Sequence, residues 1–166
     1  MLTKDQFLAM VDDETRILKH LHGKLSPANA GFRPSPQQRS TLELLRYLSM
    51  CGSAAARAMV DNGWTAYAAI KERADGMTFE QFPEALDRQS AEIHAILADL
   101  TEADLRDRTA TYPTGEVLPL GFALVMSVSR WLTAYRMQLF LYAKSTDAPD
   151  LNTANLWGGR DPQPKA

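Results

Sequence analysis

The segment from Gly121 to Lys144 reads GFALVMSVSRWLTAYRMQLFLYAK, and it is the longest apolar stretch of the chain. Apolar side chains recur in it every three or four residues, which is typical of a helix with a buried face. Pro119, just before it, belongs to a residue type that is favoured in the first turn of a helix. We therefore expect a helix from about 119 to 144. Because its apolar residues cover more than one face, this helix should be central or buried on two sides.

Length and composition limit the class of protein. The chain has 166 residues, which suits a single domain with one core. With 45% hydrophobic and 23% charged residues, it resembles neither a disordered nor a membrane-spanning protein. A net charge of −2 disfavours nucleic acid as a partner. The N-terminus enters an amphipathic pattern without the basic and apolar regions of a signal peptide, so we expect a cytoplasmic protein.

Three more long helices are expected before the apolar segment. The first runs from about Thr3 to Lys24, and the second from Ser40 to Asn62-Gly63. Both begin with the spacing of a capping box, a Ser or Thr followed three residues later by Glu or Gln. The third starts between Thr78 and Pro83 and reaches Leu100. The sequence therefore predicts an all-α four-helix bundle over residues 1–166.

The connections between these helices have distinct compositions. Residues 26–39 contain three prolines, so we expect an extended crossing there. β-Branched residues flank Pro113-Thr-Gly115, which favours a short two-stranded hairpin before the last helix. Residues 145–166 are rich in Asp, Pro, Asn and Gly, which predicts an irregular tail anchored by Trp157.

Several separated segments carry a family resemblance. They are the hairpin, the motif YRMQ at residues 135–138, and residues 32–48, which read FRPSPQQRSTLELLRYL. Together they resemble the DinB-like bundle proteins over most of the chain. That resemblance implies a four-helix bundle, commonly dimeric, with a metal held by one histidine on the second helix and two on the fourth.

The positions that match those metal ligands are Tyr47, Trp131 and Tyr135, and none is a histidine. An indole and a protonated phenol are poor metal ligands. We therefore expect no metal and no cofactor, and an aromatic pocket that either holds a small organic molecule or is filled by side chains. Rings at helical spacing are also typical of an ordinary core.

Glu14 lies on the apolar face of the first helix, where an unpaired carboxylate would be costly. It therefore needs an arginine partner, and the candidates are Arg46, Arg130 and Arg136. A structural ion pair is the simpler interpretation, although buried carboxylates also mark functional sites. Glu14 and Arg136 are accordingly secondary site candidates.

Cys51 follows Tyr47 by one helical turn and could face the same cavity as a nucleophile or soft metal ligand. Among Met, Ala and Leu, however, a free cysteine is usually a small buried hydrophobe. Being single, it excludes an internal disulfide. The three histidines, His20, His22 and His94, share no helix face and do not predict a metal site.

Three functional hypotheses follow. The first is a metal-free bundle with an aromatic pocket for a small molecule. The alternative is an enzyme resembling the family's metal-dependent thiol transferases, with a site rebuilt from Glu14, Cys51 or a histidine. The third is a structural or regulatory dimer without a ligand. Because the last helix is apolar nearly all round, a homodimer formed through residues 122–142 is expected in each case.

Overall fold

The first long helix begins where the sequence predicts in the computed structural model, which describes residues 2–163. The Thr3 hydroxyl accepts a hydrogen bond from the Gln6 N–H, and the Gln6 side chain accepts one from the Thr3 N–H, as a capping box requires. In chain order the elements are α1 (Lys4–His22), the 3₁₀ turn η1 (Pro27–Asn29), α2 (Thr41–Leu48), α3 (Cys51–Val60), α4 (Tyr67–Asp75), α5 (Phe82–Leu97), α6 (Glu102–Asp107), β1 (Thr109–Thr111), β2 (Val117–Pro119), α7 (Leu120–Leu124), η2 (Val125–Ser129), α8 (Arg130–Thr146) and α9 (Thr153–Gly158).

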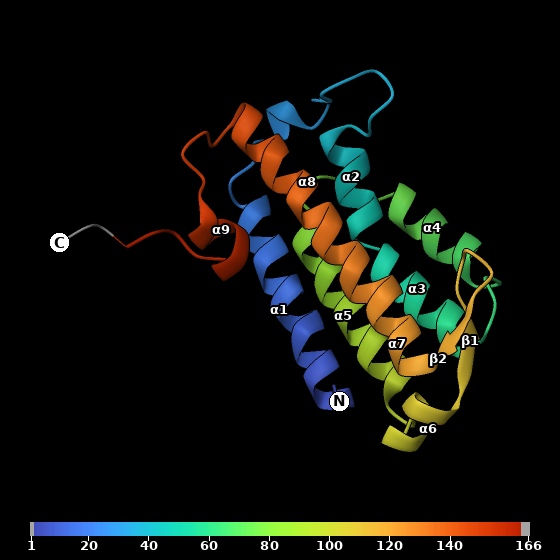
Figure 1. Cartoon of the computed structure of the whole chain (residues 1–166). Coiled ribbons are helices and arrows are strands. Elements are labelled where there is room, and N and C mark those ends of the chain that lie inside the picture. The colour runs from blue at the N-terminus through green and yellow to red at the C-terminus, as the bar shows by residue number, and fades with distance from the viewer. Residues whose placement is uncertain (1, 164–166) are drawn as a thin grey trace.

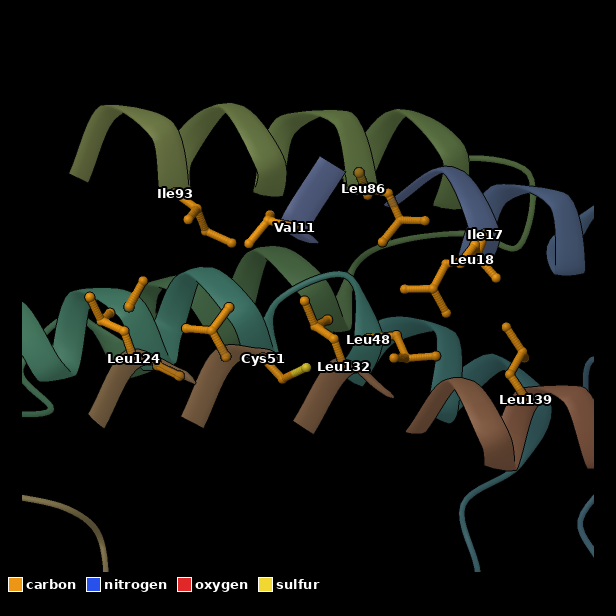
Figure 2. Packing of buried hydrophobic residues seen from close by; sticks show 14 of the residues in the cluster. Val11, Ile17, Leu18, Leu48, Cys51, Leu86, Ile93, Leu124, Leu132 and Leu139 are labelled. Atoms are coloured by element: carbon orange, nitrogen blue, oxygen red, sulfur yellow. The ribbon is translucent and has the colours of Figure 1, made fainter. Parts of the chain in front are cut away.

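Four long segments lie side by side and form the bundle (Figure 1). They are α1, the pair α2 and α3, α5, and the continuous run from α7 to α8. α8 packs against both α1 and α2, while α5 packs against α1 and α3. Figure 2 shows side chains from all four segments meeting in one core, among them Leu18, Leu48, Leu86 and Leu132. The predicted four-helix bundle is confirmed.

The second segment is broken, whereas the sequence predicts one helix over it. α2 ends at Leu48 and α3 begins at Cys51, because Met50 leaves the helical region with φ −132° and ψ −27°. Gln89 of α5 lies against the break. Its side chain accepts a hydrogen bond from the Gly52 N–H and donates one to the Leu48 carbonyl. These bonds pair backbone groups that the break leaves without helical partners.

The predicted last helix is confirmed and runs from Leu120 to Thr146 as one rod with an irregular turn. That turn, η2, is a π-helix, a conformation that widens the helix by one residue. The Ser127 hydroxyl donates to the Ala123 carbonyl within it. None of the helices in the described part of the chain is both long enough and apolar enough to span a membrane.

The hairpin is confirmed, with Thr109 opposite Pro119 and Thr111 opposite Val117. The tail is irregular over 147–152 and 159–163, as predicted, but α8 continues to Thr146 and a short helix, α9, forms at Thr153–Gly158. α9 lies against α1 (Figure 1). Its anchors are the buried Asn155 and Leu156, whereas Trp157 is 56% exposed. Trp157 is therefore not a buried anchor, although one face of its ring covers the Arg136 guanidinium, whose Cζ is 4.8 Å from the ring centroid.

Candidate functional site

The three positions that match the family's metal ligands come from α2 and α8, which pack against each other. Tyr47 and Tyr135 meet edge to face with ring centroids 4.7 Å apart. Trp131 lies one turn before Tyr135, but its ring stacks on Trp64, at 6.3 Å and 14°. The structure thus joins two of the three predicted pocket residues directly. The third belongs to a neighbouring pair of tryptophans.

A guanidinium group lies against the two tyrosines. The Arg39 Cζ is 4.2 Å from the centroid of the Tyr47 ring and 5.5 Å from that of the Tyr135 ring. Such a cation is attracted by the negative face of an aromatic ring. Within residues 2–163, the Arg39 side chain forms no salt bridge and donates no hydrogen bond. The group nearest to the expected metal position is therefore itself a cation.

The backbone of Arg39 is fixed by the last helix. The Tyr142 hydroxyl donates to the Arg39 carbonyl at 2.9 Å, and the Gln138 amide donates to the Tyr142 hydroxyl at 2.7 Å. Ser40, the next residue, is the N-cap of α2 and forms the predicted capping box with Glu43. These contacts hold Arg39 at the entrance to α2, from which its side chain reaches the two rings.

A pocket of about 390 Å³ opens beside this group between α2 and α4. We call it the Arg39 pocket, and its lining residues are Arg39, Glu43, Arg46, Tyr47, Met50, Tyr67, Lys71 and Asp75. Ligand pockets for small molecules have volumes of roughly 300–1,000 Å³. Of the three predicted pocket residues, only Tyr47 lines it. Arg39 was not predicted as a site residue, because it lies in the loop before α2 and no local sequence pattern shows that this loop places its side chain over the rings.

Burial also affects the titratable groups beside Arg39. The pKa of Tyr47 is raised, chiefly because the phenolate would lose hydration. Cys51 is fully buried, and burial raises the pKa of its thiol to about 12. Figure 2 shows Cys51 among core side chains such as Leu132. The thiol is therefore protonated near neutral pH, and its packing matches the interpretation as a small hydrophobe.

Glu14 pairs with Arg136, one of its three predicted partners. The Arg136 Nη1 and the Thr133 hydroxyl donate to the same carboxylate oxygen, at 2.8 and 2.7 Å. The second carboxylate oxygen of Glu14, the Nε of Arg136 and the Ser129 hydroxyl are buried without a partner among the described residues. Because this cluster lies between α1 and α8, it does not face the Arg39 pocket. It is an ion pair separate from that pocket.

The histidines are dispersed, as their spacing predicts. His20 contacts Asn155 of α9, His22 contacts the Phe79 carbonyl, and His94 contacts Asp12. In residues 2–163, no three His, Cys, Asp or Glu side chains come together in a group that could hold a metal ion. The alternative site rebuilt from Glu14, Cys51 or a histidine is not assembled in this part of the chain.

The metal that the family resemblance implies needs imidazoles at the positions of Tyr47, Trp131 and Tyr135. The donors present do not fit it. A neutral phenol with a raised pKa and an indole offer no good lone pair to a divalent cation. The Arg39 guanidinium beside both tyrosines would also repel a second positive charge.

Comparisons with known proteins agree with the geometry of the fold. The model of the DinB superfamily matches residues 10–129, so the chain belongs to this superfamily. A DinB-like protein from Bacillus subtilis, known from its crystal structure, is similar with a TM-score of 0.68 and 16% sequence identity. The match covers 84% of this chain and 91% of that one, and at this identity it shows the fold alone. Among curated proteins, no match is found.

Proposed function

We propose that this chain is a metal-free member of its superfamily that binds a small organic molecule in the Arg39 pocket. One observation carries the proposal. The Arg39 guanidinium lies on the faces of Tyr47 and Tyr135, where the resemblance implies a metal, and it borders a pocket of ligand size. The aromatic rings supply flat apolar surface, and the guanidinium supplies hydrogen-bond donors. This combination suits an organic ligand better than a bare cation.

The metal-dependent thiol transferase receives less support. Its rebuilt site would draw on Glu14 or Cys51, yet the Glu14 carboxylate is taken by Arg136 and Thr133. The Cys51 thiol is protonated and enclosed in the core. Neither side chain lines the Arg39 pocket.

The test has two parts. Purified protein is dialysed against Zn²⁺, Ni²⁺ and Mn²⁺, and its metal content is measured beside that of the Tyr135→His variant. We expect metal well below one ion per chain in the unmodified protein. A fragment library is then screened by ligand-observed NMR against the unmodified protein and against Tyr47→Ala, with Tyr112→Ala as a control outside the pocket. We expect hits that Tyr47→Ala alone abolishes. Stoichiometric metal, or no Tyr47-dependent hit, would overturn the proposal.

We further propose that the chain forms a homodimer through the outer face of α7 and α8. Phe122 and Leu141 are each 52% exposed, and Met137 between them is 37% exposed. Positions 137 and 141 lie one helical turn apart and share a face. Large exposed apolar residues that share a helix face, as Met137 and Leu141 do, are typical of an interface. Light scattering should give twice the chain mass for the unmodified protein and a monomer for Leu141→Asp; a concentration-independent monomer would refute the dimer.

A further inference from the structure

The Arg39 pocket has an unbalanced charge. Its lining has three cationic side chains, Arg39, Arg46 and Lys71, and two acidic ones. Both acidic groups are already engaged. Asp75 pairs with Lys71, and Glu43 pairs with Arg33 while accepting from the Ser40 N–H at 2.7 Å.

Of the three cations that line the pocket, Arg39 and Arg46 therefore have no acidic partner among the described residues. The excess of positive charge is local, since the whole chain has a net charge of −2. The pocket is therefore positively charged in a chain that is negative overall, and this favours binding of an anion there.

The hydrogen-bonding groups of both arginines are available and oriented. The contact of Arg39 with the tyrosine rings uses none of its five N–H donors. Among residues 2–163, the Arg46 side chain donates one hydrogen bond, from its Nε to the Met77 carbonyl at 2.8 Å. That bond fixes the Arg46 side chain at the end of α4 and leaves its two terminal amino groups free. A guanidinium held in this way is ready to bind a carboxylate through two parallel hydrogen bonds.

The remaining lining defines the body of the ligand. Tyr47 from α2, Met50 at the break after α2, and Tyr67 from α4 provide aromatic and thioether surface. An anion without an apolar body would leave this surface in contact with water and gain little from the pocket. We infer that the pocket binds a small organic carboxylate, with its carboxylate on Arg39 and Arg46 and its apolar body against Tyr47 and Tyr67. This inference rests on the proposed function and names the class of its ligand.

The experiment compares acids with their neutral amides. Benzoate with benzamide, 3-phenylpropanoate with 3-phenylpropanamide, and hexanoate with hexanamide are titrated calorimetrically into unmodified protein, Arg39→Gln and Arg130→Gln. Arg130 is an exposed arginine outside the pocket and controls for a general loss of charge. We expect each binding acid to exceed its amide by roughly 10- to 100-fold, as charge-assisted hydrogen bonds imply. This ratio should fall several-fold in Arg39→Gln, in which Arg46 alone remains to bind the carboxylate, and persist in Arg130→Gln.

The outcomes separate the two proposals. If amides bind as tightly as acids and Tyr47→Ala abolishes both, the proposed function stands and the inference about the carboxylate fails. If no acid or amide binds in a Tyr47-dependent way, the inference about the carboxylate fails, and the proposed function fails with it only when the fragment screen also gives no Tyr47-dependent hit. Inorganic phosphate is titrated as well. If phosphate binds as tightly as the best acid, the inference that the ligand has an apolar body fails. Thermal melting of Arg39→Gln, followed by circular dichroism, establishes that this variant is folded before its affinities are compared.

Discussion

The carboxylate of Glu14 and the guanidinium of Arg136 lie 2.8 Å apart between α1 and α8, and their side chains are only 12% and 4% exposed. A pair so far removed from water loses the hydration of both ions. The Thr133 hydroxyl supplies one further hydrogen bond, yet one carboxylate oxygen and the Arg136 Nε stay unpaired among the described residues. Replacing one member of the pair should therefore lower the stability of the protein strongly, whereas replacing both members by apolar residues should lower it little.

Arg136→Met should be strongly destabilising because it leaves the Glu14 carboxylate buried without a partner. We expect a loss of about 3–5 kcal/mol in the free energy of unfolding, measured by urea denaturation. The double variant Glu14→Leu/Arg136→Met should recover most of it, since apolar residues then fill the space. Arg57→Ala breaks an exposed pair with Asp61 and should cost less than about 1 kcal/mol. Equal losses in Arg136→Met and Arg57→Ala would contradict the prediction.

The Glu14 carboxyl group should also make the stability of the protein depend on pH. Burial raises the pKa of Glu14, against the opposing hydrogen bond from Thr133 and the charge of Arg136. In the unfolded chain the pKa returns to its ordinary value of 4.5. Between this value and the folded pKa, the folded state binds more protons, so the stabilising contribution of the protonated group is lost as pH rises. The free energy of unfolding of Glu14→Gln, relative to unmodified protein, should therefore increase from pH 4.5 to pH 7; a constant difference would exclude this linkage.

Cys51 should be unreactive in the folded protein. Its thiol is fully buried and its pKa is raised to about 12. The thiol is therefore neither ionised near neutral pH nor accessible to a reagent. Labelling with a chromogenic disulfide reagent at pH 8 should be slow in buffer and fast in urea, and the slow rate should follow the rate of unfolding. Because this cysteine is single, every signal comes from it. Rapid labelling of folded protein would restore Cys51 as a candidate nucleophile.

The bundle could be predicted from the sequence because each long helix has a local signature. Capping boxes at Thr3 and Ser40 fix two of the starts, and periodic apolar residues fix the faces. These signals depend on neighbours within about one or two helical turns. The need of Glu14 for a cationic partner was predictable in the same way, from its place on an apolar face, but three arginines remained possible because the partner, Arg136, is 122 positions away.

The candidate site could be predicted only in part. Tyr47 and Tyr135 were predicted, but the position of Arg39 depends on residues distant in sequence. The Arg39 side chain lies against Tyr47 and Tyr135, and its carbonyl accepts a hydrogen bond from the hydroxyl of Tyr142, 103 positions away in the chain. α9 is likewise stabilised by α1, where the Arg16 guanidinium donates to the Gly158 carbonyl. Composition suggested an irregular tail, and tertiary contacts outweighed it.

The break between α2 and α3 is another feature of this kind, and it yields the last prediction. Gln89 is 2% exposed and pairs with the Leu48 carbonyl and with the N–H groups of Gly52 and Ser53. Gln89→Leu keeps the volume but leaves these three buried groups unpaired, at a cost of roughly 1–3 kcal/mol each, so we expect a total loss of at least about 3 kcal/mol. Urea denaturation measures it, with the exposed Gln37→Ala as the control.

Gln89→Glu sharpens the test. An ionised carboxylate still accepts from Gly52 but cannot donate to the Leu48 carbonyl, whereas a protonated carboxyl does both. The loss of stability relative to the unmodified protein should therefore be larger at pH 7 than at pH 4.5. A Gln89→Leu variant as stable as Gln37→Ala would mean that backbone geometry alone maintains the break. A large loss of stability in Gln89→Leu, together with the expected pH dependence in Gln89→Glu, would show that the Gln89 side chain stabilises the break.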